Sequence, residues 1–313
     1  MSRFPAVMRR MPALALLLLT SGCQKLFGSD AAASSATASP SESSASETAS
    51  RPAGSSSAAS AGHGEKGAKK GEHKDHPWTY SGDKGPAHWG ELDPKWDACR
   101  AGKAQSPVDL PNRPDFPHVA PKETVKASDE TLTIDYVDVP LRVQNNGHTI
   151  QVANDGDSYI LVGANRYDLV QFHFHSPSEH TLGGERFPLE GHFVHKSEDG
   201  QLAVVGAFFT LGEAGPELAE LWRKAPKEET EEPIATPKKV LDVSSIVSTK
   251  EGYFSYAGSL TTPPCSEGVR WFVLKHVSTV DKKTVDAFRE WFDGRTNRPI
   301  QPLGDRMVRF ASR

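Results

Sequence analysis

Hydrophobic and polar residues alternate along much of the chain after residue 130, a period-two pattern that is typical of β-strands. The predicted strands are rich in Val, Ile, Phe and Tyr. They cover Thr131–Val137, Leu141–Asn145, Thr149–Val152, Tyr159–Val162, Tyr167–His175, Glu190–Lys196, Leu202–Thr210, Tyr253–Ser259 and Val269–His276. Helices are expected at Pro216–Lys224 and Ser278–Phe292, the second from an approximate apolar stripe. The acidic, proline-bounded stretch Lys227–Glu232 is interpreted as a solvated loop. We therefore predict a mainly β (α+β) domain with few helices.

The first 23 residues have the pattern of an export signal. Three arginines precede an apolar run at residues 13–19, which is too short to cross a bilayer as a helix. The following small residues lead to Cys23, as in a bacterial lipoprotein signal whose cysteine is lipidated, although Thr20 stands where that pattern usually has Leu. An ordinary secretory signal with a chance cysteine is the alternative. Gln24 rather than Asp favours the outer membrane, with the domain in the periplasm or at the cell surface.

Residues 24–75 are predicted to be a flexible tether. Within residues 29–62, 24 of 34 are Ser or Ala, and none is Leu, Ile, Val, Phe, Tyr or Trp. Such a segment cannot bury enough apolar surface to offset the entropy lost on ordering. Aromatic residues become frequent from His76, so we expect one folded domain over residues 76–313.

Charge and cysteine content exclude several classes of protein. The 313 residues include 40 acidic and 36 basic ones, and the net charge of -4 argues against a mainly electrostatic nucleic-acid binder. No stretch of 18 or more apolar residues follows the N-terminus, so membrane attachment is expected through the lipid alone. Three cysteines are too few for a disulfide scaffold or a cysteine-based zinc finger, whereas the 12 histidines include tight clusters.

The segment at residues 171–175 holds the first histidine cluster. Alternate side chains of a strand share a face, so Gln171, His173 and His175 point one way and the two phenylalanines between them point the other way. Two imidazoles at this spacing can share a metal ion. A pair of hydrogen-bonded core histidines would show the same pattern.

The strand at Glu190–Lys196 offers a third imidazole. His192 shares a face with Glu190, whereas His195 falls on the opposite face, so period-two geometry selects His192. Three imidazoles from two strands suit zinc, with the fourth position left to water. Gln171 and Glu190 each precede a ligand by two residues, where they could hold another imidazole's free N–H.

The spacing of His173, His175 and Glu179 also fits the metal motif of cupins. That motif wants glycines at two flanking positions, which Tyr167 and Arg186 occupy here. The cupin interpretation is therefore disfavoured.

A set of short blocks in a fixed order closely resembles the α-class carbonic anhydrases in their bacterial secreted form, over residues 76–313. The blocks are Gln105-Ser106-Pro107, Asn145-Asn146-Gly147-His148, Gln171 to His175, Ser178-Glu179-His180, Glu190 to His195, Ser259-Leu260-Thr261-Thr262-Pro263-Pro264 and Arg298-Pro299-Ile300-Gln301-Pro302. The resemblance implies a single domain with a central, mostly antiparallel twisted sheet of about ten strands and short peripheral helices. It implies a zinc lyase that reversibly hydrates CO2 to bicarbonate and a proton, by attack of zinc-bound hydroxide.

The resemblance also implies a role for each matching residue. The zinc ligands would be His173, His175 and His192, and the residues holding their free N–H groups would be Gln171 and Glu190. Thr261 matches the threonine that accepts a hydrogen bond from the hydroxide, and Glu179 the carboxylate that orients that threonine. His148 matches a proton-shuttle histidine, which titrates near neutral pH. The polar residues that match those ordering the shuttle's water chain are Tyr80, Asn145 and Gln151.

Further matches concern the substrate pocket and a disulfide. Thr262 lies beside Thr261, and the residues that match the apolar pocket wall are Val194, Val204, Leu260, Val269 and Trp271. Cys99 and Cys265 match cysteines that form a disulfide in similar bacterial proteins. His180 and His195 match structural positions outside the ligand set.

Two other classes of function stay open at this stage. Some relatives of this family have lost zinc ligands and serve as binding or structural domains, and a zinc-storage lipoprotein is a further alternative. Retention of all three ligands with Thr261, Glu179 and His148 favours the enzyme. The sequence leaves monomer and dimer equally open.

Overall fold

The computed structural model describes residues 75–111, 125–127 and 130–312. The predicted export signal, the tether and Cys23 lie outside the described residues. Within the described ranges, no helix combines the length and the apolar composition that crossing a membrane would require.

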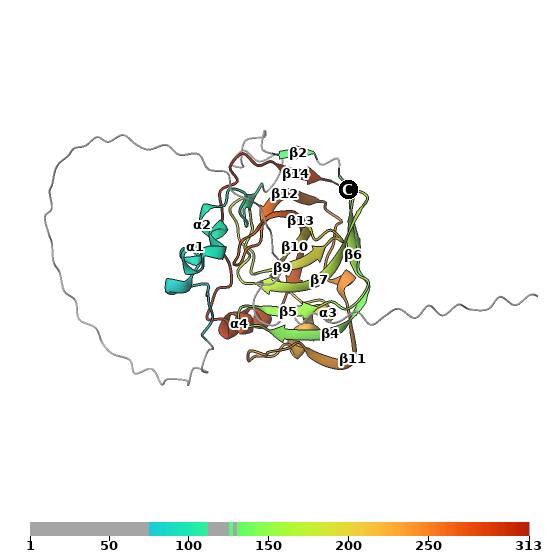
Figure 1. Cartoon of the computed structure of the whole chain (residues 1–313). Coiled ribbons are helices and arrows are strands. Elements are labelled where there is room, and N and C mark those ends of the chain that lie inside the picture. Colours follow the sequence, from blue (N-terminus) through green and yellow to red (C-terminus); the bar gives the residue numbers. More distant parts are fainter. Residues whose placement is uncertain (1–74, 112–124, 128–129, 313) are drawn as a thin grey trace, which may run out of the picture. The chain divides into compact units, whose positions relative to one another are not determined.

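A large twisted β-sheet forms the centre of the domain (Figure 1). Its main path follows the order β11-β4-β5-β7-β9-β10-β13-β12-β14-β2, and with the branch of β6 and β3 from β7 it has 12 strands within the described residues. The strands are β2 (Val125–Ala127), β3 (Leu132–Asp135), β4 (Asp138–Asn145), β5 (Ile150–Ala153), β6 (Tyr159–Val162), β7 (Asn165–His175), β9 (Leu189–Lys196), β10 (Leu202–Leu211), β11 (Ile234–Asp242), β12 (Tyr253–Ser259), β13 (Glu267–Val280) and β14 (Val308–Ala311). Two short strands, β1 (Asp109–Leu110) and β8 (Thr181–Leu182), pair separately.

Most neighbouring strands run antiparallel. The parallel pairs among the described residues are β10 with β13, β14 with β2 and β1 with β8. The prediction of a mainly β domain with a mostly antiparallel sheet is therefore confirmed.

The helices are short and lie outside the sheet. They are α1 (Trp89–Leu92), α2 (Ala98–Ala101), α3 (Pro216–Lys224) and α4 (Lys282–Trp291), together with 3-10 turns at Gly82–Lys84, Pro94–Trp96 and Val243–Ser245. The helix predicted from Ser278 was wrong at its beginning. Ser278 and Val280 belong to β13, because they continue its pairing with β10, and the helix starts after Asp281.

Three strands of the main sheet, β2, β11 and β14, were not predicted. β11 lies at the edge of the sheet, and most of its side chains are exposed, so it lacks the alternation that marks a half-buried strand. Its register with β4 also shifts between Ala235 and Val240, around Pro237. An edge strand with a proline and a bulge has a weak sequence pattern.

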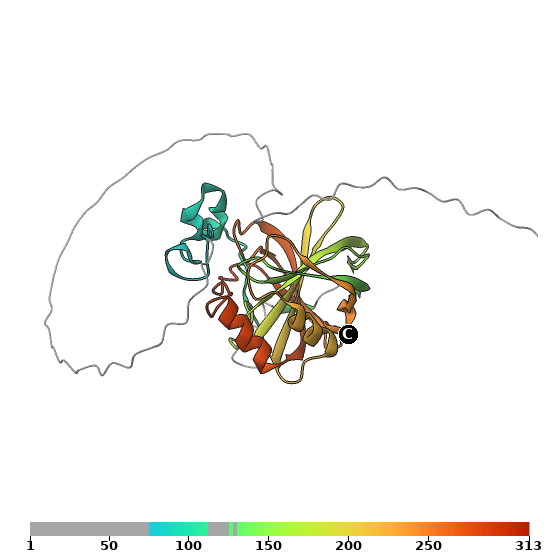
Figure 2. The ribbon, with the colours of Figure 1, turned by 90° about the horizontal axis from the view of Figure 1, so that it is seen from below.

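The two faces of the central strands contribute to different hydrophobic cores. Phe172, Phe174 and Phe193 belong to the larger core. Buried residues of α3 and α4 join that core, so these helices cover this face (Figure 2). The histidines of β7 face away from it, and beside them a second core includes Val204 and Trp271.

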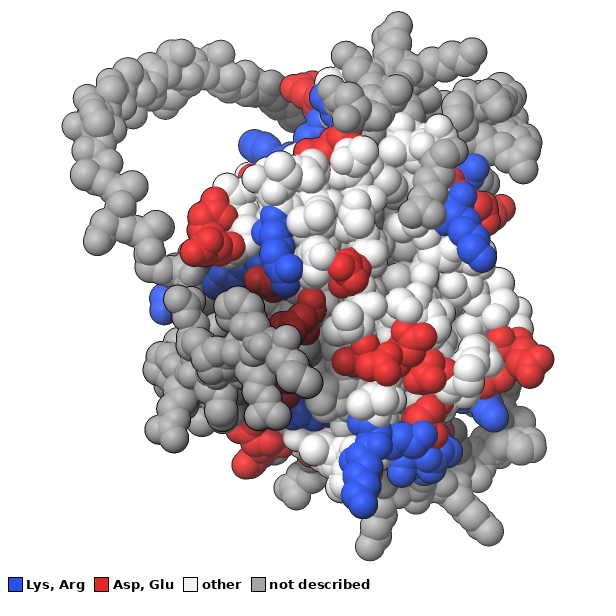
Figure 3. Space-filling model, turned by 90° about the vertical axis from the view of Figure 1, so that its right-hand side faces the viewer, with Lys and Arg blue, Asp and Glu red and all other residues white. Residues whose placement is uncertain are grey.

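The N-terminal part of the domain has its own aromatic cluster. Trp78, Trp89 and Trp96 pack with Cys99 and Cys265. The face in Figure 3 shows acidic and basic side chains in small separate groups around a wide uncharged area.

Candidate functional site

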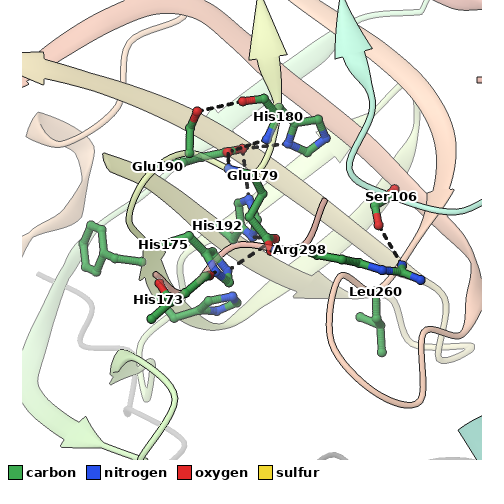
Figure 4. Close-up of polar contacts among 12 residues, drawn as sticks. Ser106, His173, His175, Glu179, His180, Glu190, His192, Leu260 and Arg298 are labelled. Carbon is green, nitrogen blue, oxygen red and sulfur yellow. Dashed lines mark hydrogen bonds and ion pairs between the residues drawn. The ribbon is translucent and has the colours of Figure 1, made fainter. Parts of the chain in front are cut away.

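Three imidazoles converge where β7 and β9 pair. His173 and His192 are register partners in this antiparallel pair, and His175 lies two residues further along β7 on the same face. The ring centroids are 5.4 Å apart for His173 and His192, and 4.5 Å apart for His175 and His192. Figure 4 shows the three rings close together. One ring nitrogen from each lies within 4.8 Å of the others, which is a geometry able to bind a metal ion.

The hydrogen bonds of the two β7 imidazoles indicate which nitrogen is available. Nδ1–H of His173 donates to the Gln171 side-chain carbonyl at 2.9 Å, and Nδ1–H of His175 donates to the Thr296 carbonyl at 2.6 Å. Both partners are acceptors, so the protons lie on Nδ1 and the Nε2 lone pairs remain. Nε2 of His175 is buried and has no hydrogen-bond partner among the described residues. An orphaned buried acceptor of this kind suits a metal ligand.

In His192 the bonded nitrogen is Nε2, whereas in His173 and His175 it is Nδ1. Its Nε2–H donates to Glu190 Oε1 at 2.9 Å, which leaves Nδ1 to face the other rings. Gln171 and Glu190 therefore each hold the imidazole two residues on along the same strand, and not one on the neighbouring strand. Residues two apart on a strand point to the same face, and this brings the longer side chain beside the next imidazole.

Burial keeps the β7 imidazoles neutral. Burial, together with the neighbouring imidazoles, lowers the pKa of His173 well below its usual value, and burial also lowers the pKa of His175. A neutral imidazole is the form that binds a metal.

A second group of possible ligands, His180, Glu190 and His192, lies just behind the first. Here the side chains satisfy one another, because Glu190 Oε1 accepts from both His180 Nδ1 (2.7 Å) and His192 Nε2 (2.9 Å). Glu190 Oε2 accepts the backbone N–H groups of Glu179 and His180. Although burial alone would raise it, the two imidazoles lower the pKa of Glu190 well below its usual value. This group is a support for His192.

Glu179 brings a buried carboxylate to the edge of the histidine group. Its Oε1 accepts the backbone N–H of Arg298 at 2.7 Å. Its Oε2 lies 3.6 Å from His175 Nε2 and has no hydrogen-bond partner among the described residues. Thr261, which was expected to donate to this carboxylate, is 5% exposed, but the structure forms no hydrogen bond between the two. Glu179 therefore has one acceptor atom left for a donor inside the site.

The loop that carries Thr261 is fixed from the N-terminal side. Cys99 and Cys265 form the expected disulfide across 166 residues of sequence. The Gln105 side chain donates to the Cys265 carbonyl at 3.1 Å, and the buried guanidinium of Arg298 donates to the Cys99 carbonyl at 2.9 Å. Thr261 is thus held in place by contacts at the base of its loop.

Arg298 is a structural centre that the sequence reasoning missed. It is 1% exposed, and its guanidinium also donates to the Gln105 side chain at 2.8 Å. A further donation goes to the Ser106 carbonyl, also at 2.8 Å (Figure 4). Burial lowers its pKa to about 10, against the opposing effect of Glu179. The signal that could have pointed to this role is the charged residue at the start of the block Arg298-Pro299-Ile300-Gln301-Pro302.

The apolar residues expected to form the pocket wall lie together in the second core. Val204 is the register partner of Val194 on one side and of Trp271 on the other. The Trp271 ring lies 4.8 Å from the ring of His192. Val269 is in the same core, and Leu260 packs against it. Thr262 is half-buried beside Thr261.

His148 lies apart from the three imidazoles, on the turn after β4. Asn146 shapes the turn, since its side-chain oxygen accepts the backbone N–H groups of His148 (3.0 Å) and Thr149 (2.9 Å). The His148 ring stacks on Trp78 with centroids 3.7 Å apart and 7° between planes. Burial, together with His76, lowers its pKa to about 3. In this position His148 does not titrate near neutral pH, which differs from the expectation because the sequence gives no sign of the stack.

The three residues expected to order water have different surroundings. Tyr80 lies edge-on to His175 with ring centroids 6.4 Å apart, and Gln151 is the register partner of His173. Asn145 is 3% exposed, and its amide donates to the carbonyls of Pro226 and Lys227. The described contacts of Asn145 therefore hold a loop and the turn of His148.

Comparison with known proteins shows the family to which the chain belongs. Residues 84–312 match the family model described as eukaryotic-type carbonic anhydrase. A carbonic anhydrase of Pectobacterium carotovorum is 38% identical over 232 residues, which cover 74% of this chain and 89% of that protein.

Solved structures agree as well. The α-carbonic anhydrase of Thermovibrio ammonificans, solved with the inhibitor sulfanilamide, matches with a TM-score of 0.68 and 41% identity, covering 74% of this chain and 98% of that one. Dioscorin, solved in complex with ascorbate, matches with a TM-score of 0.65 and 31% identity, covering 75% and 98%. The chain thus belongs to the eukaryotic-type (alpha) carbonic anhydrase family, a family of carbonate dehydratases.

Proposed function

We propose that this protein hydrates CO2 to bicarbonate at a zinc ion held by His173, His175 and His192. One observation carries the proposal: in each imidazole one nitrogen donates to a fixed acceptor, and the other faces its two partners. Such outer hydrogen bonds are what metal-binding histidines require to keep one tautomer and one ring orientation. The three nitrogens are also the donor type that zinc prefers.

His173, His175 and His192 would hold the zinc ion, which when bound would lower the pKa of a water molecule towards 7 and so would supply a nucleophile at neutral pH. The chain's own residues provide orientation and exclusion of water. The Thr261 hydroxyl would donate a hydrogen bond to the remaining oxygen of Glu179 and would accept, on its own oxygen, a hydrogen bond from the O–H of the nucleophile. The orphaned Oε2 of Glu179 supports this pairing.

The apolar wall suits a small uncharged substrate. CO2 offers little to hydrogen-bond, so an apolar surface beside a polar nucleophile binds it without a desolvation cost for polar groups. Val194, Val204 and Trp271 form such a surface next to His192. The charged product has no partner there, which favours its release.

His148 is proposed to carry away the proton that each turnover leaves behind. Against Trp78 its pKa is about 3, so it holds no proton there at neutral pH. Proton uptake therefore requires the ring to turn away from the stack into water, where an imidazole has a pKa near 6.5. Tyr80 and Gln151, which flank the ligands, are proposed to order the intervening water.

Stopped-flow CO2 hydration by the purified protein tests the proposal. The assay is run as purified, after zinc removal with a chelator, and after zinc is restored. Hydration that disappears and returns with zinc supports it, and a folded, zinc-loaded protein without hydration would refute it. His173→Ala separates an enzyme from a binding protein on the same fold, since the enzyme loses both zinc and activity.

The activity is proposed to be exported. The export signal, the Ser/Ala-rich tether and Cys23 support a domain anchored by lipid in the cell envelope, at the outer membrane. CO2 and bicarbonate are then the only partners that the proposal needs.

A further inference from the structure

A second imidazole touches the proposed shuttle residue. The ring centroids of His76 and His148 are 4.5 Å apart, with 57° between the planes. The His76 side chain is 19% exposed, so buffer can reach it. His148 thus lies between Trp78 on one side and a second proton-binding ring on the other.

Glu229 fixes the orientation of His76. Nε2 of His76 lies 3.2 Å from Glu229 Oε2. An ionised carboxylate only accepts, so Nε2 carries the proton of neutral His76 and Nδ1 carries the lone pair. This is the tautomer that can accept a proton at one nitrogen and release another at the nitrogen next to Glu229.

The loop with Glu229 is docked against the turn of His148. Besides the Asn145 amide, which binds its beginning, the Thr230 N–H donates to the Asn145 carbonyl at 2.8 Å. The Gln144 side chain donates to the carbonyls of Thr230 and Glu231, both at 3.0 Å. The segment Lys227–Glu232 is a loop as predicted, and four of its six residues are exposed. Its backbone carbonyls and the Thr230 N–H nevertheless bond to the end of β4, which the prediction of a solvated loop did not include.

A glycine makes room for the second ring. A Cβ on Gly147 would lie 2.4 Å from Cε1 and Nε2 of His76. Gly147 also has φ +84, which glycine adopts without strain. The residue before His148 thus permits the close approach of His76.

We propose that His76 is a second proton carrier, which takes the proton from His148 and passes it to buffer with the help of Glu229. The proposal rests on the proposed function and deepens it. The proton leaves a ring nitrogen of the His148 imidazolium and binds Nδ1 of His76, while the Nε2 proton of His76 passes to a buffer base. No electrons are transferred.

The surroundings of His148 and His76 support proton transfer from His148 to His76. Burial and His76 make a charged His148 unfavourable in the stacked position, so the ring releases its proton when it returns there. The Glu229 carboxylate lies 3.2 Å from Nε2 of His76, and the Lys84 ammonium donates to the His76 backbone carbonyl at 2.9 Å. Return of the His148 ring to the stack therefore favours release of its proton to the neighbouring His76 ring, whose side chain is 19% exposed.

Steady-state kinetics of the full-length, zinc-loaded protein test this proposal. His76→Phe keeps an aromatic ring beside His148 but removes both nitrogens. We expect kcat in dilute buffer to fall several-fold, kcat/KM to stay unchanged, and a high concentration of a small imidazole buffer to restore kcat. Glu229→Gln should lower kcat in the same direction. His88→Phe, which changes an exposed histidine paired with Glu91 in the same N-terminal segment, is the matched control and should behave as wild type.

The double variant His76→Phe/His148→Ala shows whether the two residues act in series. If the two residues act one after the other, kcat of the double variant is no lower than kcat of His148→Ala alone. A wild-type kcat for His76→Phe, or a double variant slowed further by the full His76→Phe factor, would overturn the proposal. Circular dichroism and zinc content confirm that each variant is folded and loaded. A wild-type protein without zinc-dependent hydration would instead refute the proposed function itself.

Discussion

Loss of the Gln171 side chain should weaken zinc binding without unfolding the protein. Gln171→Ala removes the 2.9 Å hydrogen bond that fixes the Nδ1–H tautomer of His173. The freed ring can rotate and place its proton on the ligand nitrogen. Loss of such an outer partner costs about 10–100-fold in metal affinity, which corresponds to about 1.4–2.7 kcal/mol.

The unfolding free energy of the zinc-free protein should change much less than the free energy of zinc binding. Gln171 is only half-buried, and one neutral hydrogen bond contributes about 1 kcal/mol. Zinc affinity is measured by competition with a chromophoric chelator, and stability by urea unfolding of the zinc-free protein. Gln201→Ala is the control, because its amide bonds to Asp199 in an exposed turn. Unchanged zinc affinity in Gln171→Ala, or an equal loss in Gln201→Ala, would refute the tautomer argument.

Three further predictions concern stability and location. Replacement of Cys99 and Cys265 by Ser should lower the unfolding free energy by about 5 kcal/mol in the chain-entropy model, measured by chemical denaturation; a loss below 1 kcal/mol would contradict it. Burial lowers the pKa of His195, which is fully buried beside Tyr136, to about 3. The unfolded chain therefore binds a proton at this position that the folded one does not as pH falls below about 6.5, and His195 alone should contribute a loss of about 1.4 kcal/mol of stability per pH unit towards pH 3. His195→Gln should flatten this slope, and an unchanged slope would count against the assignment. Cys23→Ser should move the protein from the membrane fraction to the soluble fraction, and retention in the membrane fraction would exclude lipid anchoring through Cys23.

The sequence predicts the strands at the centre of the sheet well because they are buried on defined faces. Period-two geometry separated His192 from His195, and in the structure His195 indeed faces the other way, bonded to Tyr136. The limits of β6, β12 and α3 coincide with the predicted ranges. Alternation carries this information wherever one face packs against a core.

Long-range packing explains what the sequence did not predict. Arg298 is buried because it satisfies carbonyls nearly two hundred positions away in the chain, and no local pattern encodes that. The same holds for the stack of His148 on Trp78 and for the docking of the Glu229 loop. The start of α4 was misplaced because pairing of β13 with β10 overrides the apolar spacing near Val280.

The most direct test of the account is an anomalous difference map at the zinc absorption edge, from crystals of the zinc-loaded protein. The account predicts one peak at about 2.0–2.1 Å from three nitrogens, namely Nε2 of His173, Nε2 of His175 and Nδ1 of His192. A peak among His180, Glu190 and His192, or one that lacks any of the three predicted nitrogens, would contradict it.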